Sequence, residues 1–130
     1  MRIVLALVGT LFLLSGCGFL YNPAGAFPPR TVTHENSGDE ITLAHGQQLF
    51  VRLPFKAEPG YEWVLREPPV TAVKPEGAPD QDREGGIERW TFTPVRDGEQ
   101  TLRLEYRRPE DYLVAPAESV SYNVTVEQKP

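Results

Sequence analysis

The clearest structural signal in the sequence is Leu102-Arg103-Leu104-Glu105-Tyr106, in which apolar and charged side chains alternate. Successive side chains of a β-strand point to opposite faces, so this period of two predicts a strand with one buried and one solvated face. Residues 120–126 repeat the pattern, with apolar side chains at every second position. We find no sustained 3.6-residue period of the kind that an amphipathic helix requires. The sequence therefore predicts an all-β protein.

Shorter runs of the same kind predict further strands at residues 41–43, 49–53, 61–65, 70–74 and 90–92. Together with the two long runs they give about seven short strands, and their one-sided alternation requires two sheets that bury their apolar faces against each other. An immunoglobulin-like antiparallel β-sandwich of about seven strands fits best. Asp97-Gly98 is a typical hairpin turn, so the strands that contain Trp90 and Leu102 are predicted to pair antiparallel.

The composition suits one folded domain with an acidic surface. A chain of 130 residues is long enough to bury one core, and 40% apolar with 24% charged residues is ordinary for a globular protein. The 18 acidic side chains outnumber the 13 basic ones, and the isoelectric point is near 5.0. Such a surface repels phosphate backbones, so nucleic acid is not an expected partner.

The N-terminal residues resemble a bacterial lipoprotein signal. Arg2 precedes the apolar run 3–14, which is too short to cross a hydrocarbon core of roughly 30 Å as a helix. Leu14-Ser15-Gly16-Cys17 then resembles the lipoprotein box, in which the cysteine receives the lipid. We expect residues 1–16 to be a signal peptide and Cys17 to be lipidated; a buried or incidental thiol is the alternative. Acyl chains on Cys17 would anchor the protein to a membrane.

Residues 17–30 are predicted to form a lipidated, flexible tether to a β-sandwich domain over residues 31–130. Glycine, proline and scattered aromatic residues follow one another there without periodicity. Gly18 stands where an Asp would resemble a signal for retention in the inner membrane, so the outer membrane of a bacterial envelope is expected, with the domain facing the periplasm or the exterior. A single cysteine allows no disulfide within the chain, so core packing must hold the domain in that oxidising compartment.

Three short segments between predicted strands carry the functional signal: Pro59-Gly60-Tyr61-Glu62-Trp63, Gly85-Gly86 and Tyr106-Arg107-Arg108-Pro109. Their order and spacing resemble the chagasin-like inhibitors of papain-type cysteine proteases. That family's pattern is Asn-Pro-Thr-Thr-Gly-Tyr/Phe with a Trp two residues on, then Gly-x-Gly-Gly, then Tyr-x-Arg-Pro-Trp. The resemblance covers nearly all of residues 40–127. It implies an immunoglobulin-like fold whose loops enter the protease cleft.

The first loop, led by Glu58, Pro59, Gly60 and Tyr61, is the one that the resemblance places in the active-site groove. Proline fixes its own φ and glycine permits unusual backbone angles, so Pro59-Gly60 predicts a stiff turn that loses little entropy on binding. A plain structural turn is the alternative. Aligned from Gly60 backwards, the family's Asn-Pro-Thr-Thr becomes residues 56–59 here, which places the carboxylate of Glu58 close to the protease's catalytic groups.

Large aromatic residues in sandwich strands usually belong to the core, and we expect this of Trp63, Trp90 and Tyr106. In the resembling family such aromatic residues support the loops. Trp63 is therefore assigned both to the core and to the predicted binding site.

The second loop, Gly85-Gly86, matches the last part of the Gly-x-Gly-Gly pattern. An alternative is calcium binding, because Asp80, Asp82 and Glu84-Gly85 match the first half of a helix-loop-helix calcium site. Thr91 stands where that site needs a bidentate glutamate, and neither flank has a helical pattern. A solvated acidic loop is the simpler account, and no metal site is predicted.

The third loop keeps Arg108-Pro109 at the family spacing, but Glu110 replaces the final tryptophan. Arg108 offers a planar set of hydrogen-bond donors to a partner, and Tyr112 could supply the missing aromatic contact. A solvated arginine at a loop tip is the alternative.

Enzymatic chemistry has little support in the sequence. The sole cysteine is assigned to the lipid, and the two histidines, His34 and His45, have no patterned Ser or Asp partner nearby. We predict that the chain is not an enzyme and needs no cofactor. The resemblance instead implies a monomeric inhibitor that fills the cleft of a papain-like cysteine protease. A non-inhibitory envelope binding or structural lipoprotein, which kept the fold and lost the inhibitory loop tips, is the alternative.

Overall fold

Nine strands and two short 3₁₀ helices make up the part of the chain that the computed structural model describes, which is residues 27–56, 59–66 and 70–128. In chain order they are β1 (Arg30–Thr33), η2 (His34–Asn36), β2 (Glu40–Leu43), β3 (Leu49–Pro54), β4 (Glu62–Arg66), β5 (Val73–Pro75), β6 (Asp80–Asp82), β7 (Ile87–Pro94), β8 (Gly98–Arg107), η3 (Pro109–Asp111) and β9 (Glu118–Val126). Two predicted functional residues, Cys17 and Glu58, lie outside the described residues, as does the predicted signal peptide.

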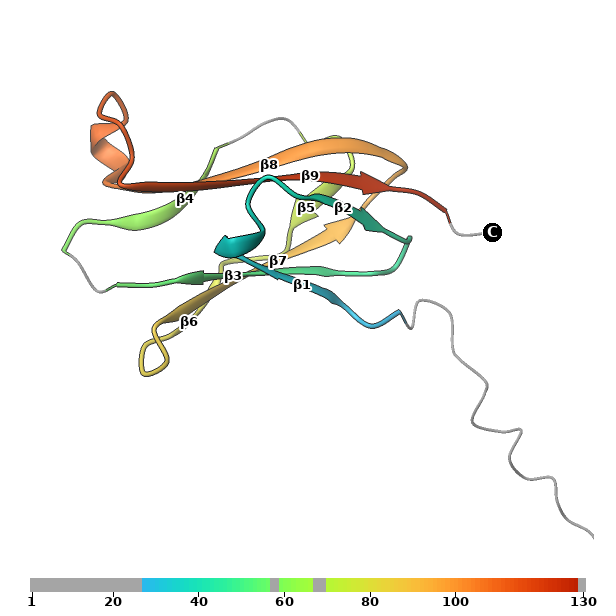
Figure 1. Ribbon diagram of the computed structural model, residues 1–130, viewed down its shortest axis with the longest axis horizontal. Coiled ribbons are helices and arrows are strands. Elements are labelled where there is room, and N and C mark those ends of the chain that lie inside the picture. Colours follow the sequence, from blue (N-terminus) through green and yellow to red (C-terminus); the bar gives the residue numbers. More distant parts are fainter. Residues whose placement is uncertain (1–26, 57–58, 67–69, 129–130) are drawn as a thin grey trace, which may run out of the picture.

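The strands form two sheets that face each other across the core (Figure 1). The first sheet has the order β1-β3-β7-β5, and β6 also pairs with β7; the second has the order β2-β9-β8-β4. This confirms the predicted all-β, immunoglobulin-like sandwich. Both sheets are mixed rather than purely antiparallel, because β1 runs parallel to β3 and β2 runs parallel to β9. The short strands β1 and β6 were not predicted.

In the structure, the burial of side chains along the long strands follows the predicted period of two. On β8 and β9 the apolar side chains at alternate positions are buried, and they meet those of β2 and β3 in one core. Removing a large side chain of this kind from water stabilises the fold by roughly 1.5 to 3 kcal/mol. The members of the core are Val32, Ile41, Leu43, Leu49, Val51, Leu53, Trp63, Ala72, Val73, Phe92, Leu102, Leu104, Tyr106, Val120, Tyr122, Val124 and Val126.

The predicted hairpin at Asp97-Gly98 is wrong. The turn joins β7 to β8, but β7 belongs to the first sheet and β8 to the second, where it pairs with β4 and β9. The backbone N–H of Val95 donates to the carbonyl of Ala72 at 2.7 Å, which fixes the crossing segment against the start of β5. A turn motif predicts only that the chain reverses its direction. The strand with which the next segment pairs depends on packing, because the apolar faces of β7 and β8 must both reach the core.

The acidic segment around Asp80 is also ordered in a way that composition did not predict. Its side chains are exposed, but Asp80–Asp82 pairs with β7, with Asp82 opposite Ile87. The calcium alternative needs helices on both sides of the loop, and strands β6 and β7 stand there instead. Among the described residues, no three His, Cys, Asp or Glu side chains are arranged to hold a metal ion.

Candidate functional site

The three predicted loops lie together at one end of the sandwich, which we call the loop pole (Figure 1). Strand register brings them together. Pro54, where β3 ends, is opposite Ile87, where β7 begins, and Glu62 at the start of β4 is opposite Arg107 at the end of β8. The loop pole therefore consists of the described parts of residues 55–61, of residues 83–86 and of residues 108–117.

The first loop is held by two aromatic side chains of the core. The indole N–H of Trp63 donates to the carbonyl of Pro54 at 2.8 Å, and the hydroxyl of Tyr106 donates to the carbonyl of Lys56 at 2.7 Å. Both residues are buried, as predicted, and their rings lie 5.3 Å apart between centroids. A hydrogen bond of this kind stabilises by about 1 kcal/mol net, so the strand end and the loop entrance are fixed together.

The predicted turn Pro59-Gly60 is exposed, and Gly60 has a φ of +81°. A residue with a Cβ is strained at that angle, which is the physical reason for a glycine here. Tyr61 follows with its ring half-buried, 5.5 Å from the ring of Tyr106. The turn is thus presented outwards from a fixed aromatic base.

The second loop is tied to the first through its glycines. The carbonyl of Gly86, whose φ is +67°, accepts from the backbone N–H of Phe55 at 2.7 Å. The N–H of Gly85 donates to the carboxylate of Asp82 at 2.9 Å, and a Cβ on Gly85 would come within 2.5 Å of that carboxylate. The positive φ of Gly86 favours glycine there, and a side chain at Gly85 would have to displace the carboxylate of Asp82.

The third loop approaches the first through Arg108. Its guanidinium lies 5.1 Å from the centre of the Tyr61 ring, which is a cation–π distance, while the side chain remains exposed. Pro109 begins the short helix η3, and Tyr112 is the C-cap that follows its last residue, Asp111. The structure therefore brings the described residues of the three predicted loops to one end of the sandwich: Pro59, Gly60, Tyr61, Gly85, Gly86, Arg108, Pro109 and Tyr112.

Sequence reasoning missed the buried ion pair behind the third loop. Glu105 was expected to face solvent, yet Glu105 and Arg107 are both buried, with Arg107 Nε 2.9 Å from Glu105 Oε1. Arg107 Nη1 also donates to the carbonyl of Asp111 at 2.9 Å, inside the third loop. The available signal was the cluster of alternating charges on the outer face of β8, where Arg103 also lies 3.6 Å from Glu105.

Trp90 is only half-buried, although it was expected in the core. It packs against the core, 6.2 Å from the ring of Phe92, and its indole N–H donates to the buried carboxylate of Glu88 at 2.7 Å. Gln81 also donates to Glu88, at 2.9 Å. The buried Glu88 thus connects Trp90 with Gln81 of β6.

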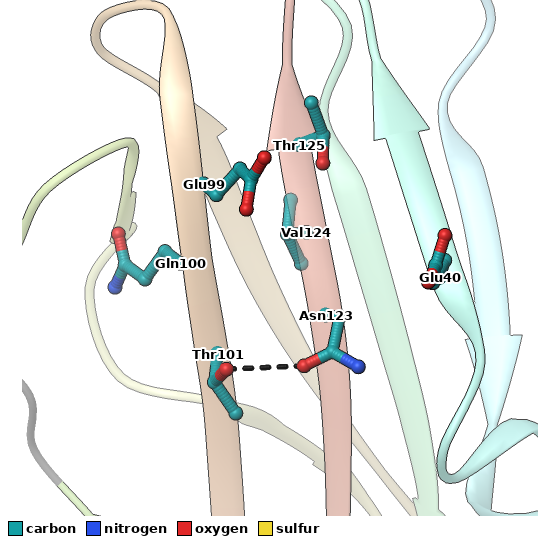
Figure 2. Close-up of a pocket in the computed structure, with 7 residues that line it drawn as sticks. All are labelled: Glu40, Glu99, Gln100, Thr101, Asn123, Val124 and Thr125. Carbon is teal, nitrogen blue, oxygen red and sulfur yellow. Dashed lines mark hydrogen bonds between the residues drawn. The ribbon is translucent and has the colours of Figure 1, made fainter.

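The loop pole protrudes rather than enclosing a pocket. The hollow between Tyr61, Arg107, Arg108, Asp111 and Val114 measures only about 30 Å³. A larger hollow of about 320 Å³ lies on the outer face of the second sheet, away from the loops (Figure 2). Polar side chains line it, and the hydroxyl of Thr101 donates to Asn123 at 3.0 Å. The hollow at the loop pole is therefore about a tenth as large as the one on the sheet.

Neither histidine joins the loop pole. His34 is exposed in η2, and His45 contacts the exposed Asp97. Within the described ranges, no helix has the length and apolar character needed to cross a bilayer.

The family model for chagasin-family peptidase inhibitors of type I42 matches residues 42–126, which is most of the chain and includes all three loops. The chain belongs to the chagasin family. Members of this family are peptidase inhibitors, which confirms the prediction that the chain is not an enzyme.

Three solved structures are similar to the chain in fold or in sequence. The cysteine protease inhibitor EhICP2 from Entamoeba histolytica is 19% identical, with a TM-score of 0.68 over 77% of this chain and 96% of that one. Amebosin is 27% identical, with a TM-score of 0.58 over 78% of this chain and 100% of that one. PbICP-C in complex with falcipain-2 is 20% identical, with a TM-score of 0.49 over 76% and 89%. No curated protein matches the chain.

Proposed function

We propose that this chagasin-family chain inhibits papain-type cysteine proteases by inserting the loop pole into the active-site cleft. Membership of a peptidase inhibitor family supports an inhibitory role, and the similar fold of EhICP2, a cysteine protease inhibitor, supports the cysteine class. The observation that carries the proposal is the attachment of the first loop where it leaves β3: Trp63 holds the carbonyl of Pro54 at the strand end, and Tyr106 holds the carbonyl of Lys56 inside the loop. A loop already fixed in shape loses less entropy when it binds.

Inhibition would be steric. The exposed turn Pro59-Gly60 would enter the cleft first. The second loop supports the first loop through the hydrogen bond from Phe55 N–H to the Gly86 carbonyl, and Arg108 lies beside the turn, over the Tyr61 ring. Filling the cleft with a fixed backbone excludes substrate without any covalent step. Arg108 keeps exposed N–H donors that can pair with carbonyl or carboxylate oxygens of the protease.

We further propose that the protein is a lipoprotein, anchored through Cys17 to the outer membrane after removal of residues 1–16. The lipoprotein-like sequence Leu14-Ser15-Gly16-Cys17 supports this. Strand β1 begins at the end of the sandwich away from the loops (Figure 1). An anchor that enters there would leave the loop pole facing away from the lipid surface.

A second candidate is a non-inhibitory binding or structural lipoprotein of the envelope. It is favoured by Glu110, which stands where the resembling inhibitors have tryptophan, because an acidic side chain cannot replace a buried aromatic anchor. In that case the loops would serve another partner, and the fold would be unchanged.

The deciding experiment is a titration of the full chain, purified in detergent, against papain and cathepsin-like proteases. We expect inhibition at micromolar concentration or below. Gly60→Ala should weaken it about tenfold, because a Cβ at φ +81° displaces the leading turn. Gly77→Ala is the matched control: Gly77 also has a positive φ, at +66°, but lies in the turn between β5 and β6.

Each glycine variant should lower the free energy of unfolding by about 1 kcal/mol. The difference between their inhibition constants therefore reports the contribution of the Pro59-Gly60 turn to binding. Absence of inhibition at micromolar concentration across this class of protease would reject the first candidate. A stable envelope partner that survives Gly60→Ala and is not a protease would support the second.

A further inference from the structure

The tip of the third loop exposes three successive apolar side chains. Tyr112 is 66% exposed, Leu113 90% and Val114 63%. We call the segment of these three residues the aliphatic tip, after the side chains of Leu113 and Val114. In the rest of the described chain, the large hydrophobic side chains that are exposed occur singly, at Phe27, Val70 and Val95. Single exposed apolar residues are ordinary, but a contiguous patch indicates an interaction site.

The aliphatic tip is exposed in a fixed conformation. The buried Arg107 donates to the carbonyl of Asp111 at 2.9 Å, and the same guanidinium is held by Glu105 at 2.9 Å. Two turn hydrogen bonds continue the loop, from Asp111 N–H to the Arg108 carbonyl and from Val114 N–H to the Asp111 carbonyl, both at 3.0 Å. Apolar side chains on a fixed loop can bind without a large loss of entropy.

Beside the aliphatic tip two acidic side chains outnumber one basic side chain, the exposed Arg108, which lines a small hollow together with Asp111 and Val114. Glu110 and Asp111 directly precede it and are both exposed. Carboxylates in this position oppose contact with an anionic lipid surface and favour a partner with basic side chains around its apolar contact. A protein hollow with a basic rim fits these charges better than a membrane does.

We propose that the aliphatic tip is the specificity-determining anchor of the third loop, with Leu113 at its centre, and that it occupies an apolar hollow with a basic rim beside the cleft of the target protease. Arg107 is its positioning residue, because it holds the loop through the Asp111 carbonyl. This inference rests on the proposed function. It assigns the role of the absent tryptophan to side chains three to five residues after Pro109.

The first test compares inhibition constants of the full chain and the variant Leu113→Ser/Val114→Ser, with the protease that the wild type inhibits best. Exposed side chains contribute little to folding, so the variant should fold normally while its inhibition constant rises about 30-fold. Val95→Ser is the matched control, because Val95 is 39% exposed but lies at the opposite end of the sandwich. It should change the inhibition constant less than about twofold.

The outcomes separate this inference from the proposed function. If the double variant inhibits the protease as strongly as the wild type does, the aliphatic tip is not an anchor, but the proposed inhibitory function is unaffected. Absence of inhibition by the wild type overturns both. If the Cys17→Ser chain binds anionic vesicles and this binding requires Leu113, the aliphatic tip is a lipid-binding segment. That result would overturn the proposal that it occupies a hollow of the protease.

The positioning role of Arg107 is tested by a double-mutant cycle. Arg107→Lys keeps a positive charge near Glu105 but loses the planar hydrogen bond to the loop. We expect it to weaken inhibition about tenfold in the wild type and hardly at all in Leu113→Ser/Val114→Ser, since the two changes act on one contact. Equal losses in both backgrounds, with unfolding curves showing both proteins folded, would overturn this role.

The basic rim is tested by Glu110→Lys. Reversal of a charge at the edge of an interface acts mainly on the association rate. At low ionic strength we expect association with the protease to slow about tenfold, and the difference to shrink as salt is added. An unchanged association rate would overturn the proposal that basic side chains of the protease surround the hollow.

Discussion

Trp63 and Tyr106 each connect the core to the loop pole with one side chain. The ring of each is buried, while its polar group donates to a backbone carbonyl, that of Pro54 at the end of β3 for Trp63 and that of Lys56 in the first loop for Tyr106. A purely apolar side chain could fill the same volume but could not hold the backbone. This explains why aromatic residues with a hydrogen-bond donor stand at these positions, and why their core role and their functional role coincide.

Arg107 and Glu105 show how a buried ion pair can be tolerated near a surface loop. Burial removes hydration from both charges, which costs several kcal/mol unless the remaining polar atoms are paired. Here the guanidinium also donates to the Asp111 carbonyl, and Arg66 and Arg103 approach Glu105 at 3.9 and 3.6 Å. The pair therefore fixes the third loop more than it stabilises the fold.

Tyr122 gives a prediction for the pH dependence of folding. Burial, with a further contribution from the charge of Asp39, raises the pKa of its hydroxyl from 10.0 to about 12. The hydroxyl donates to the Thr33 carbonyl at 2.7 Å, so its loss of a proton is costly in the folded state. Stability is therefore fully present below about pH 10, where both states are protonated, and falls as the pH rises towards 12 because the unfolded chain ionises first.

The size of this effect is up to about 3 kcal/mol, from a shift of two pKa units. Denaturant unfolding at pH 9, 10 and 11.5 should show a steeper loss of stability for the wild type than for Tyr122→Phe. The variant keeps the ring and also controls for the titration of other tyrosines and lysines. Parallel pH profiles for the two proteins would contradict the prediction.

At the scale of elements, the two sheets are joined by a side chain as well as by the core. Oε1 of Gln100 on β8 accepts from three successive backbone N–H groups at the entrance to β5, those of Thr71, Ala72 and Val73, at 3.0, 2.7 and 3.0 Å. Strand β5 has only three residues. We therefore infer that this contact, and not strand pairing alone, fixes where β5 begins.

Replacement of Gln100 tests that inference. Gln100→Met removes the acceptor for three amides and should lower the free energy of unfolding by about 1 to 3 kcal/mol. Gln100→Glu retains an oxygen in the same place, and a carboxylate accepts from N–H groups at least as well, so its stability should be close to that of the wild type. Equal losses in the two variants, measured by denaturant unfolding, would show that the contact is not what stabilises β5.

At the scale of the whole molecule, function and attachment are separated. The three loops gather at one end of the sandwich, whereas β1 begins and β9 ends at the other (Figure 1). The end of the predicted tether is fixed to the domain there, since Gln47 donates to the Pro28 carbonyl at 3.0 Å and Arg30 N–H donates to the Gln48 carbonyl at 2.9 Å. An anchored molecule could therefore present its loops outwards.

The proposed anchor predicts a simple result in a bacterial host. The wild-type chain should incorporate labelled palmitate and sediment with the outer membrane, whereas Cys17→Ser should do neither and should remain folded. Removal of the only cysteine leaves no side chain to carry the lipid, so both the palmitate label and the outer-membrane attachment that depends on it should be lost. Membrane association of Cys17→Ser equal to that of the wild type would reject lipidation at this residue.

The binding loops could be predicted as far as backbone chemistry determines them. Pro59-Gly60 and Gly85-Gly86 need particular backbone angles, and such needs are visible in residue type. Arg107 could not be recognised in the same way, because a charged side chain on the outer face of a strand is usually solvated. Its burial depends on Asp111, which reaches it only after the chain has turned through η3.

By itself, the sequence determined the β-sandwich, the core face of its long strands and the three loops, because alternation and turn chemistry are local properties of the chain. Only the tertiary structure decided which strands pair, that Asp97-Gly98 crosses between sheets, and that a buried ion pair supports an exposed apolar tip. These features depend on contacts between residues distant in sequence, where packing of the two sheets prevails over local preference.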